Sequence, residues 1–252
     1  MSGYEEFRIA YRPSPNHGER RSGLKPDLLL LHYTSMETAE AAIEWLCTPV
    51  SEVSCHYLVD IDGQIVQMVS EDRRAWHAGA SHWAGEADIN SCSIGIEIQN
   101  VGPTNGYPDF PDVQMRAVEA LCLDILSRHD IAPERVLAHS DVAPGRKIDP
   151  GEKFDWARLH RAGIGHWVEP APITQGSEFE PGSKGYEVGE LQTALADYGY
   201  GIDVTGVYDT ATESVVQAFQ LHFRQAKTGG VADRSTRDTL LALQTALDPT
   251  IS

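Results

Sequence analysis

The sequence predicts an α+β protein with a mixed β-sheet flanked by helices, followed by a small three-helix domain. Two patterns support this fold class. In the first part of the chain short β-like runs alternate with helical periods, whereas the C-terminal part has three helical stretches and no comparable strands. The 252 residues, 41% of them hydrophobic, provide enough apolar material for two modest cores.

The first domain begins with a strongly apolar strand. Residues 28–32 read LLLLH, which is typical of a buried central strand, and residues 36–46 follow with helical spacing. Residues 56–60 and 64–69 are two further β-like runs, and the Asp-Gly pair between them favours a tight hairpin turn. We therefore expect a strand, a helix and a hairpin in this order.

A second apolar strand carries a carboxylate. In residues 93–99 (SIGIEIQ) three isoleucines alternate with Gly95, Glu97 and a glutamine, so Glu97 is expected on the face opposite the isoleucines. Apolar residues at helical spacing over 113–126 predict a helix, and residues 135–139 predict a further strand that His139 closes.

A change in composition after Trp167 predicts the domain boundary. Residues 168–184 contain several prolines and glycines and little apolar material, which is typical of a linker. We expect a catalytic domain over residues 1–167 and a three-helix domain over 185–252. The helical stretches of the second domain are 188–195, 215–219 and 240–247.

Charge, hydropathy and cysteine usage exclude several classes of function. A formal net charge of -17 disfavours binding to nucleic acid or to an anionic membrane surface. No apolar run approaches the roughly 20 residues of a membrane span, and the first residues lack the pattern of a secretory signal, so this chain is not expected to encode its export. Four cysteines without a C-x-x-C pair are interpreted as small buried thiols, with a disulfide as the alternative in an oxidising compartment. They are Cys47, Cys55, Cys92 and Cys122.

Three potential metal ligands stand at the ends of predicted strands or in the loop beyond. His32 ends LLLLH, His139 ends VLAH, and Asp149 follows in HSDVAPGRKIDPG. Two imidazoles and a carboxylate are a common catalytic zinc set, in which a fourth position stays open for water. The spacing of these residues is by itself weak evidence for a metal site, because each of them, taken singly, is more often a packed or surface residue than a ligand.

The surrounding motifs resemble a known family. LLLLHYTS, SCHYLVDIDGQIVQMV, AWHAG, SIGIEIQN and LAHSDVAPGRKIDPGEKFDW follow the order of the zinc-dependent N-acetylmuramoyl-L-alanine amidases of the amidase-2 type, which are related to peptidoglycan recognition proteins. The resemblance covers roughly residues 28–156. It implies one bound Zn²⁺ and five site residues: the ligands His32, His139 and Asp149, the catalytic carboxylate Glu97, and Lys147 as the cation near the reacting carbonyl.

Amide hydrolysis requires these residue types. It needs an activated water, a proton carrier for the leaving amine, and a group that stabilises the oxyanion. Glu97 on the polar face of its strand suits the proton transfer, and the ammonium of Lys147 suits the oxyanion. Lys147 and Asp149 are two residues apart, so in an extended segment both side chains leave the same face. Without the resemblance, Glu97 and Lys147 would be interpreted as solvated surface residues.

Three further residues are candidates for substrate binding. His77 in AWHAG resembles a substrate-groove position of the family. Tyr33 is a candidate for the wall of a groove for sugar and peptide, although an aromatic residue beside a strand is more often core. Asn100 is a candidate partner of the stem peptide. His56 is interpreted as a packed residue or as a support for a ligand.

Residues 187–223 resemble a second family, the type-1 peptidoglycan-binding domain. The L-Q-x-x-L motif, the VTGVYD turn and the VVQAFQ helix carry this resemblance, and all are chiefly core and turn positions. A structural or dimerising role is therefore the alternative to wall binding. We expect truncation after Trp167 to spare the cleavage of soluble muropeptides and to impair that of insoluble wall. If the module instead packs on the catalytic domain and helps to form its groove, we expect equal losses on both substrates.

The sequence thus predicts zinc-dependent hydrolysis of the amide bond between N-acetylmuramic acid and L-alanine, in peptidoglycan or muropeptides, during bacterial cell wall turnover or recycling. One alternative is a non-catalytic peptidoglycan-recognition protein of the same fold, which the intact ligand set disfavours. Another is a zinc peptidase that cuts within the stem peptide. The wall-binding module favours the envelope, whereas the missing signal and the scattered cysteines favour the cytoplasm, so localisation stays open.

Overall fold

The computed structural model describes residues 8–247, which form two compact units. Unit 1 takes in the described residues up to 79, together with 88–137 and 161–165. Unit 2 consists of 80–87, 138–160 and the described residues from 166 onward. Two segments of the predicted catalytic domain therefore belong to the same unit as the C-terminal helices.

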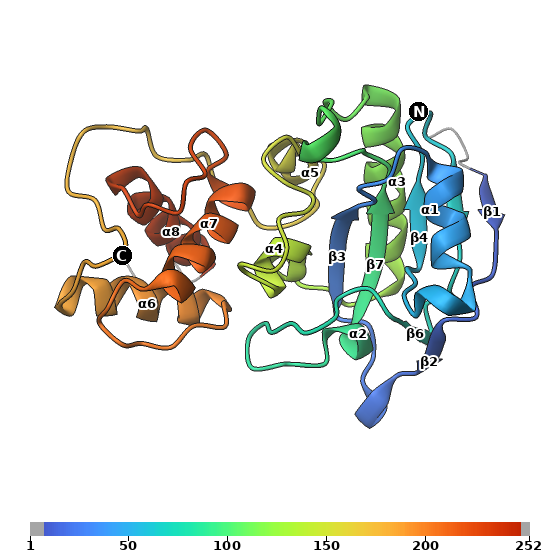
Figure 1. The fold of residues 1–252 in the computed structure, drawn as a ribbon, viewed down its shortest axis with the longest axis horizontal. Coiled ribbons are helices and arrows are strands. Elements are labelled where there is room, and N and C mark those ends of the chain that lie inside the picture. Colours follow the sequence, from blue (N-terminus) through green and yellow to red (C-terminus); the bar gives the residue numbers. More distant parts are fainter. Residues whose placement is uncertain (1–7, 248–252) are drawn as a thin grey trace. The chain divides into compact units, whose positions relative to one another are not determined.

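A six-stranded mixed sheet is the centre of unit 1 (Figure 1). Its strands are β1 (Ile9–Tyr11), β3 (Leu28–Tyr33), β4 (Tyr57–Val59), β5 (Ile65–Gln67), β7 (Ser93–Ile98) and β8 (Val136–Ala138). They lie in the order β1-β5-β4-β7-β3-β8. β7 runs parallel to both β3 and β4, β1 runs parallel to β5, and β4 and β5 form the antiparallel hairpin that the Asp-Gly turn predicted.

Two helices cover opposite faces of this sheet (Figure 1): α1 (Ala39–Leu46) and α3 (Asp112–Arg128). α1 packs its apolar side chains against Leu58 and Met68. On α3, the Gln114 amide donates to the carbonyl oxygens of Val59 and Gln99, at 3.1 and 2.9 Å. The remaining elements of this unit are short: β2 (His17–Glu19) and β6 (Arg73–Ala75), which pair antiparallel, α2 (Ile89–Cys92), and the 3₁₀ turns η1 (Arg21–Gly23), η2 (Pro49–Ser51), η3 (Pro103–Asn105) and η4 (Pro133–Arg135).

The mixed sheet flanked by helices confirms the predicted fold class. Most element boundaries differ from the predicted ranges by one or more residues, and for two of them a hydrogen bond gives the reason. The helix expected from residue 36 begins at Ala39, because the Thr38 hydroxyl accepts the N–H of Ala41 and caps the first turn. The prediction that His139 closes a strand is wrong. β8 ends at Ala138, and His139 is the first residue of α4 (His139–Val142), whose Asp141 carboxylate accepts the Ala138 N–H at 2.8 Å.

Unit 2 contains the three C-terminal helices that the sequence predicted: α6 (Tyr186–Tyr198), α7 (Thr210–Phe223) and α8 (Arg234–Leu247). Their shared core includes Leu195, Phe219 and Leu243. α5 (Trp156–Arg161) runs across the division between the units. No helix in the described part of the chain has the length and apolar character needed to span a membrane.

The segment predicted as a linker is fastened to these helices. The Ala171 N–H donates to the Thr239 hydroxyl at 3.0 Å, and Phe179 pairs with Ala232 through two backbone hydrogen bonds of 3.2 and 2.9 Å. It therefore follows the surface of the module.

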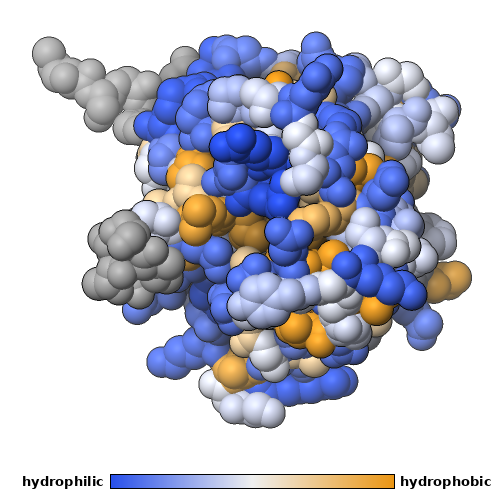
Figure 2. All heavy atoms as spheres, turned by 90° about the vertical axis from the view of Figure 1, so that its left-hand side faces the viewer, coloured by the Kyte–Doolittle hydropathy of each residue, from blue (hydrophilic) through white to orange (hydrophobic). Residues whose placement is uncertain are grey.

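A groove with a volume of about 420 Å³ lies between α6 and α8. Figure 2 shows this side of the module, where apolar side chains are flanked by hydrophilic ones. The groove, called the α6–α8 groove below, is lined by Phe179, Leu191, Ala194, Leu240 and Leu241 and by the polar Glu187, Glu190, Arg237, Asp238 and Gln244.

Candidate active site

β3 and β7 place a histidine and a glutamate side by side in unit 1. His32 is the register partner of Glu97 in this parallel pair. Residues in register on neighbouring strands point to the same face of a sheet, so both side chains leave the face opposite the isoleucines of β7. His32 is buried and Glu97 is half-buried. The predicted ligand and the predicted catalytic carboxylate of this unit are thus neighbours.

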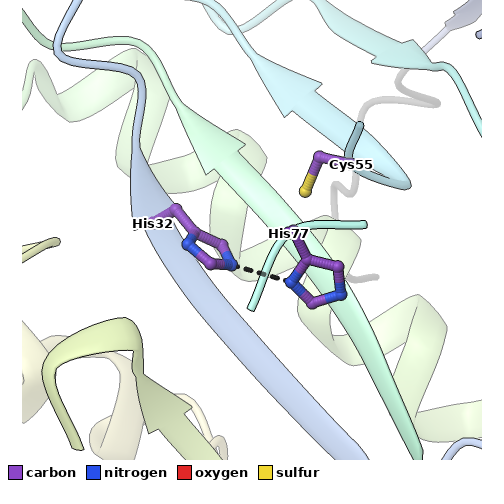
Figure 3. A group of neighbouring side chains, drawn as sticks. All are labelled: His32, Cys55 and His77. Carbon is purple, nitrogen blue, oxygen red and sulfur yellow. Dashed lines mark hydrogen bonds between the residues drawn. The ribbon is translucent and has the colours of Figure 1, made fainter. Parts of the chain in front are cut away.

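His77, from the loop after β6, lies on the same face (Figure 3). Its Nδ1 is 3.0 Å from the Nε2 of His32, and the two rings meet edge to face. The ring occupies the space above Gly95, since a Cβ built on this glycine would lie 2.5 Å from Nδ1 of His77. The absence of a side chain at Gly95 therefore makes room for the contact between the two histidines.

The hydrogen bonds around His77 define which nitrogen of each neutral ring carries the proton. The Ser93 hydroxyl donates its hydrogen to the Ile89 carbonyl oxygen at 2.6 Å, so it accepts from Nε2 of His77, which is 3.1 Å away. A neutral imidazole has one N–H and one acceptor nitrogen. Nδ1 of His77 then accepts from the Nε2–H of His32, and the lone pair of His32 is on Nδ1. This is the neutral, oriented form of imidazole that binds metals.

His56 is the packed histidine that the sequence suggested. It is fully buried, its Nδ1 accepts the Gly95 N–H at 2.9 Å, and its Nε2 lies 3.1 Å from the Arg73 carbonyl oxygen. Burial lowers the pKa of His56 to about 3, and the charge of Arg20 acts in the same direction. The ring is therefore neutral near pH 7 and holds β7 at the point where His77 lies over it.

Cys55 lies close to His32 and His77, and together these residues form a group with potential metal-binding atoms (Figure 3). Burial, and then the charge of Glu97, raise the pKa of the Cys55 thiol well above its ordinary value. Since the thiolate is the form that binds metals, a protonated Cys55 is a poor ligand. All four cysteines are free thiols. The interpretation as small buried residues holds for Cys55, Cys92 and Cys122, whereas Cys47 is half-buried.

The other two predicted ligands lie together in unit 2. Nδ1 of His139, on α4, is 3.0 Å from Oδ2 of Asp149, and both side chains are buried. The Asp149 carbonyl oxygen accepts the N–H of Ser140 at 3.1 Å, which fastens the loop after α4 back onto the helix. Arg146 donates to the Ala80 carbonyl oxygen at 2.7 Å and lies beside the same histidine ring, 3.5 Å from its Nε2.

Lys147 directly follows a turn over residues 144–146. The N–H groups of Arg146 and Lys147 both donate to the Ala143 carbonyl oxygen, at 3.1 and 3.0 Å, and this defines a turn. Lys147 is half-buried. Residues 147 and 148 belong to no assigned strand, and the common face of Lys147 and Asp149 stays a prediction.

Two of the predicted substrate-binding residues have structural contacts. Tyr33 is 9% exposed and packs edge to face against Tyr107. The Asn100 side chain donates to the Pro108 carbonyl oxygen and accepts the Gly102 N–H, both at 3.0 Å, so it holds the loop after β7. His77 contacts His32, a contact that the sequence analysis missed. The glycine at position 95, in an otherwise bulky strand, is the signal from which a close approach there could have been predicted.

The fold and these residues define the class of protein. A family model described as N-acetylmuramoyl-L-alanine amidase matches residues 22–152, and the chain belongs to this family. A second model, described as a peptidoglycan binding domain, matches residues 184–240. The chain is therefore an N-acetylmuramoyl-L-alanine amidase with a C-terminal module of the peptidoglycan-binding type, as its motifs predicted. The match to the amidase family disfavours the non-catalytic alternative.

Individual relatives resemble nearly the whole chain. The N-acetylmuramoyl-L-alanine amidase AmiD of Escherichia coli (strain K12) is 35% identical over 230 residues, which are 86% of this chain and 81% of AmiD. The crystal structure of AMPDH3 from Pseudomonas aeruginosa aligns with a TM-score of 0.73 at 31% identity over 99% of both chains. A complex of Escherichia coli AmiD with the substrate anhydro-N-acetylmuramic acid-L-Ala-D-gamma-Glu-L-Lys aligns with a TM-score of 0.74 at 33% identity over 93% of both chains.

Proposed function

We propose that this amidase is zinc-dependent and that His32, His139 and Asp149 hold the metal. The observation that carries the proposal is the hydrogen-bond chain from Ile89 through Ser93 and His77, which leaves the lone pair of His32 on Nδ1. His139 and Asp149 supply the second imidazole and the carboxylate. His32 belongs to unit 1, and His139 and Asp149 belong to unit 2. Their donor types suit Zn²⁺.

The protein groups account for the proton transfers of amide hydrolysis. Zinc, when bound by such a set, polarises a carbonyl and lowers the pKa of a bound water to about 7. Glu97, the register partner of His32, takes the proton of the attacking water and returns it to the departing amide nitrogen. Lys147, half-buried two residues before Asp149, carries a positive charge that stabilises the developing oxyanion.

The substrate that we propose is a muropeptide with the N-acetylmuramic acid to L-alanine amide, because a solved AmiD complex contains such an anhydro-muropeptide. We assign binding of the polymer to the C-terminal module, with the α6–α8 groove as its surface. Ligand sites combine apolar lining with polar groups that orient the ligand, and five of the ten lining residues of this groove are apolar and five are polar.

Metal analysis of the purified protein tests the ligand set. We expect zinc in the wild type, a loss of zinc in His139→Ala, and wild-type zinc in the control His160→Ala, which replaces an exposed histidine of the same unit. Undiminished zinc in His139→Ala would remove this residue from the ligand set.

Glu97→Gln tests the catalytic carboxylate. The amide has the same shape and cannot accept the proton, so we expect retained zinc and a turnover lower by about 100-fold or more. Hydrolysis at nearly the wild-type rate would contradict the assignment. Mass spectrometry of the products also identifies the bond cleaved, since an amidase releases a peptide that begins with L-alanine, whereas a peptidase leaves L-alanine on the sugar.

A further inference from the structure

Unit 2 joins the C-terminal helices to the segment that carries two of the proposed zinc ligands. The connection centres on Asp141, two residues after His139 and fully buried. Its Oδ2 accepts the backbone N–H of Ala138 at 2.8 Å, which closes the first turn of α4. Because a four-residue helix has almost no stability of its own, this bond is a main local constraint on the backbone that presents His139.

Two residues of the C-terminal module hold the same carboxylate. The Tyr200 hydroxyl donates to Oδ1 of Asp141 at 2.7 Å, and Nδ1 of His222 is 2.6 Å from Oδ2. Tyr200 and His222 are each about 2% exposed. Burial, and then the charge of Asp141, raise the pKa of Tyr200 well above its ordinary value, so its hydroxyl remains a donor.

Packing fixes the orientation of His222. Its imidazole lies between the rings of Trp156 and Phe223, with centroid distances of 3.7 and 3.8 Å and interplanar angles of 26° and 8°. A ring held between two flat faces can turn only in its own plane, and the bond to Asp141 sets that rotation. A buried carboxylate is costly unless its oxygens accept hydrogen bonds, so Asp141 depends on the module for the side-chain donors Tyr200 and His222.

Other contacts within unit 2 attach the module on both sides of this carboxylate. The Ala84 N–H donates to the Gly199 carbonyl oxygen at 2.8 Å, beside the contact between Trp83 and Tyr200. The Gln225 side chain donates to the Phe154 carbonyl oxygen at 2.7 Å. Trp83, Ala84 and Phe154 belong to the two segments of the predicted catalytic domain that are part of unit 2.

We propose that the C-terminal module is a structural part of the active site: Tyr200 and His222 hold the Asp141 carboxylate, which fixes the turn that presents the zinc ligand His139. Asp141, Tyr200 and His222 are positioning residues in this scheme. The inference rests on the proposed ligand set, and it assigns to the module a role in the chemistry of small soluble substrates as well as of polymer.

Two substitutions in the full-length chain test this role. Tyr200→Phe removes one hydroxyl, and His222→Phe keeps a stacked ring but removes the donor to Asp141. We expect each variant to stay folded and to bind zinc about 10- to 100-fold more weakly, as when a hydrogen-bond partner of a metal ligand is lost. Zinc affinity is measured by competition with a chromophoric chelator, and kcat and KM of the zinc-saturated variants are measured on a soluble anhydro-muropeptide, where kcat is expected to fall more than KM rises.

Two further variants separate positioning from packing. Tyr198→Phe removes a neighbouring hydroxyl that bonds to His166 instead, and should leave zinc affinity unchanged. His222→Asn loses the stacked ring but places an amide donor near the position of Nδ1, so it should bind zinc more tightly than His222→Phe. A purely packing role predicts the reverse order, with His222→Phe close to the wild type.

The possible outcomes distinguish this inference from the proposed function. Wild-type zinc affinity in both Tyr200→Phe and His222→Phe, with zinc lost in His139→Ala, would overturn the positioning role and leave the ligand set intact. Undiminished zinc in His139→Ala would overturn both. Weaker zinc binding in Tyr200→Phe and His222→Phe but not in Tyr198→Phe would support the role.

Discussion

Gly95→Ala is expected to damage the metal site without touching a metal ligand. Gly95 lies on β7 beneath the ring of His77, and its backbone conformation is open to alanine. The added Cβ would lie 2.5, 2.6 and 2.7 Å from three ring atoms of His77. The ring must therefore move, and with it the hydrogen bond that orients His32.

The size of the effect follows from these distances. Carbon contacts are normally about 3.5 to 4.0 Å long, so the ring must retreat by about 1 Å. The bond between His77 and His32, 3.0 Å in the structure, would then exceed the usual hydrogen-bond range of about 3.5 Å and be lost. Loss of such a partner weakens metal binding by about 10- to 100-fold, or roughly 1.4 to 2.7 kcal/mol. The overpacked site is also expected to cost about 1 to 3 kcal/mol of unfolding free energy.

Competition with a chelator measures the loss of zinc affinity, and urea unfolding of the metal-free protein measures the loss of unfolding free energy. Gly18→Ala is the matched control, because it adds the same methyl group to a strand glycine with no atom within 4 Å. In the double variant Gly95→Ala/His77→Ala the clash is gone, so its zinc affinity should equal that of His77→Ala alone. Wild-type zinc affinity in Gly95→Ala, or additive losses in the double variant, would refute the reasoning.

Three further predictions concern catalysis, acid stability and the module. Lys147→Ala should lower kcat more than it raises KM, because the ammonium acts mainly in the transition state; a raised KM at unchanged kcat would make Lys147 a substrate-binding residue. The pKa of His56 is about 3 in the folded protein and 6.5 in the unfolded chain, so protonation favours unfolding as the pH falls below 6.5, by about 2 kcal/mol at pH 5. In urea unfolding, His56→Asn should not show the loss of unfolding free energy that protonation of His56 causes between pH 6.5 and 5. Glu71 titrates at lower pH, because its hydrogen bonds outweigh its desolvation and lower its pKa to about 2. If the unfolding free energy of the variant falls with pH as steeply as that of the wild type, His56 is not the cause of the loss. Deletion of residues 168–252 should reduce activity on soluble muropeptides as well as on sacculi, since Asp141 loses its two side-chain donors; a loss confined to sacculi would instead favour a tethering role.

The sequence determined the elements whose signals are local. The apolar run of β3, the alternation in β7 and the helical spacing of α3 each follow from neighbouring residues, because side-chain periodicity is a property of one segment. The family motif identified the ligand-type residues for the same reason, since HSDVAPGRKIDPG is a continuous run. The edge strands β1, β2 and β6 lack such a signal, since each is only three residues long and owes its conformation to pairing with another segment.

Tertiary structure alone decided which residues face one another and how the ends of elements form. The sequence could not show that His139 opens a helix, because the bond from Ala138 to Asp141 depends on a carboxylate that is held by Tyr200 and His222, far along the chain. It likewise could not place His77 over Gly95. Buried polar groups must find hydrogen-bond partners, but any of many polar residues can satisfy that need until packing brings particular ones together. For this reason the local motif identified the chemistry of the site, and the fold determined what supports it.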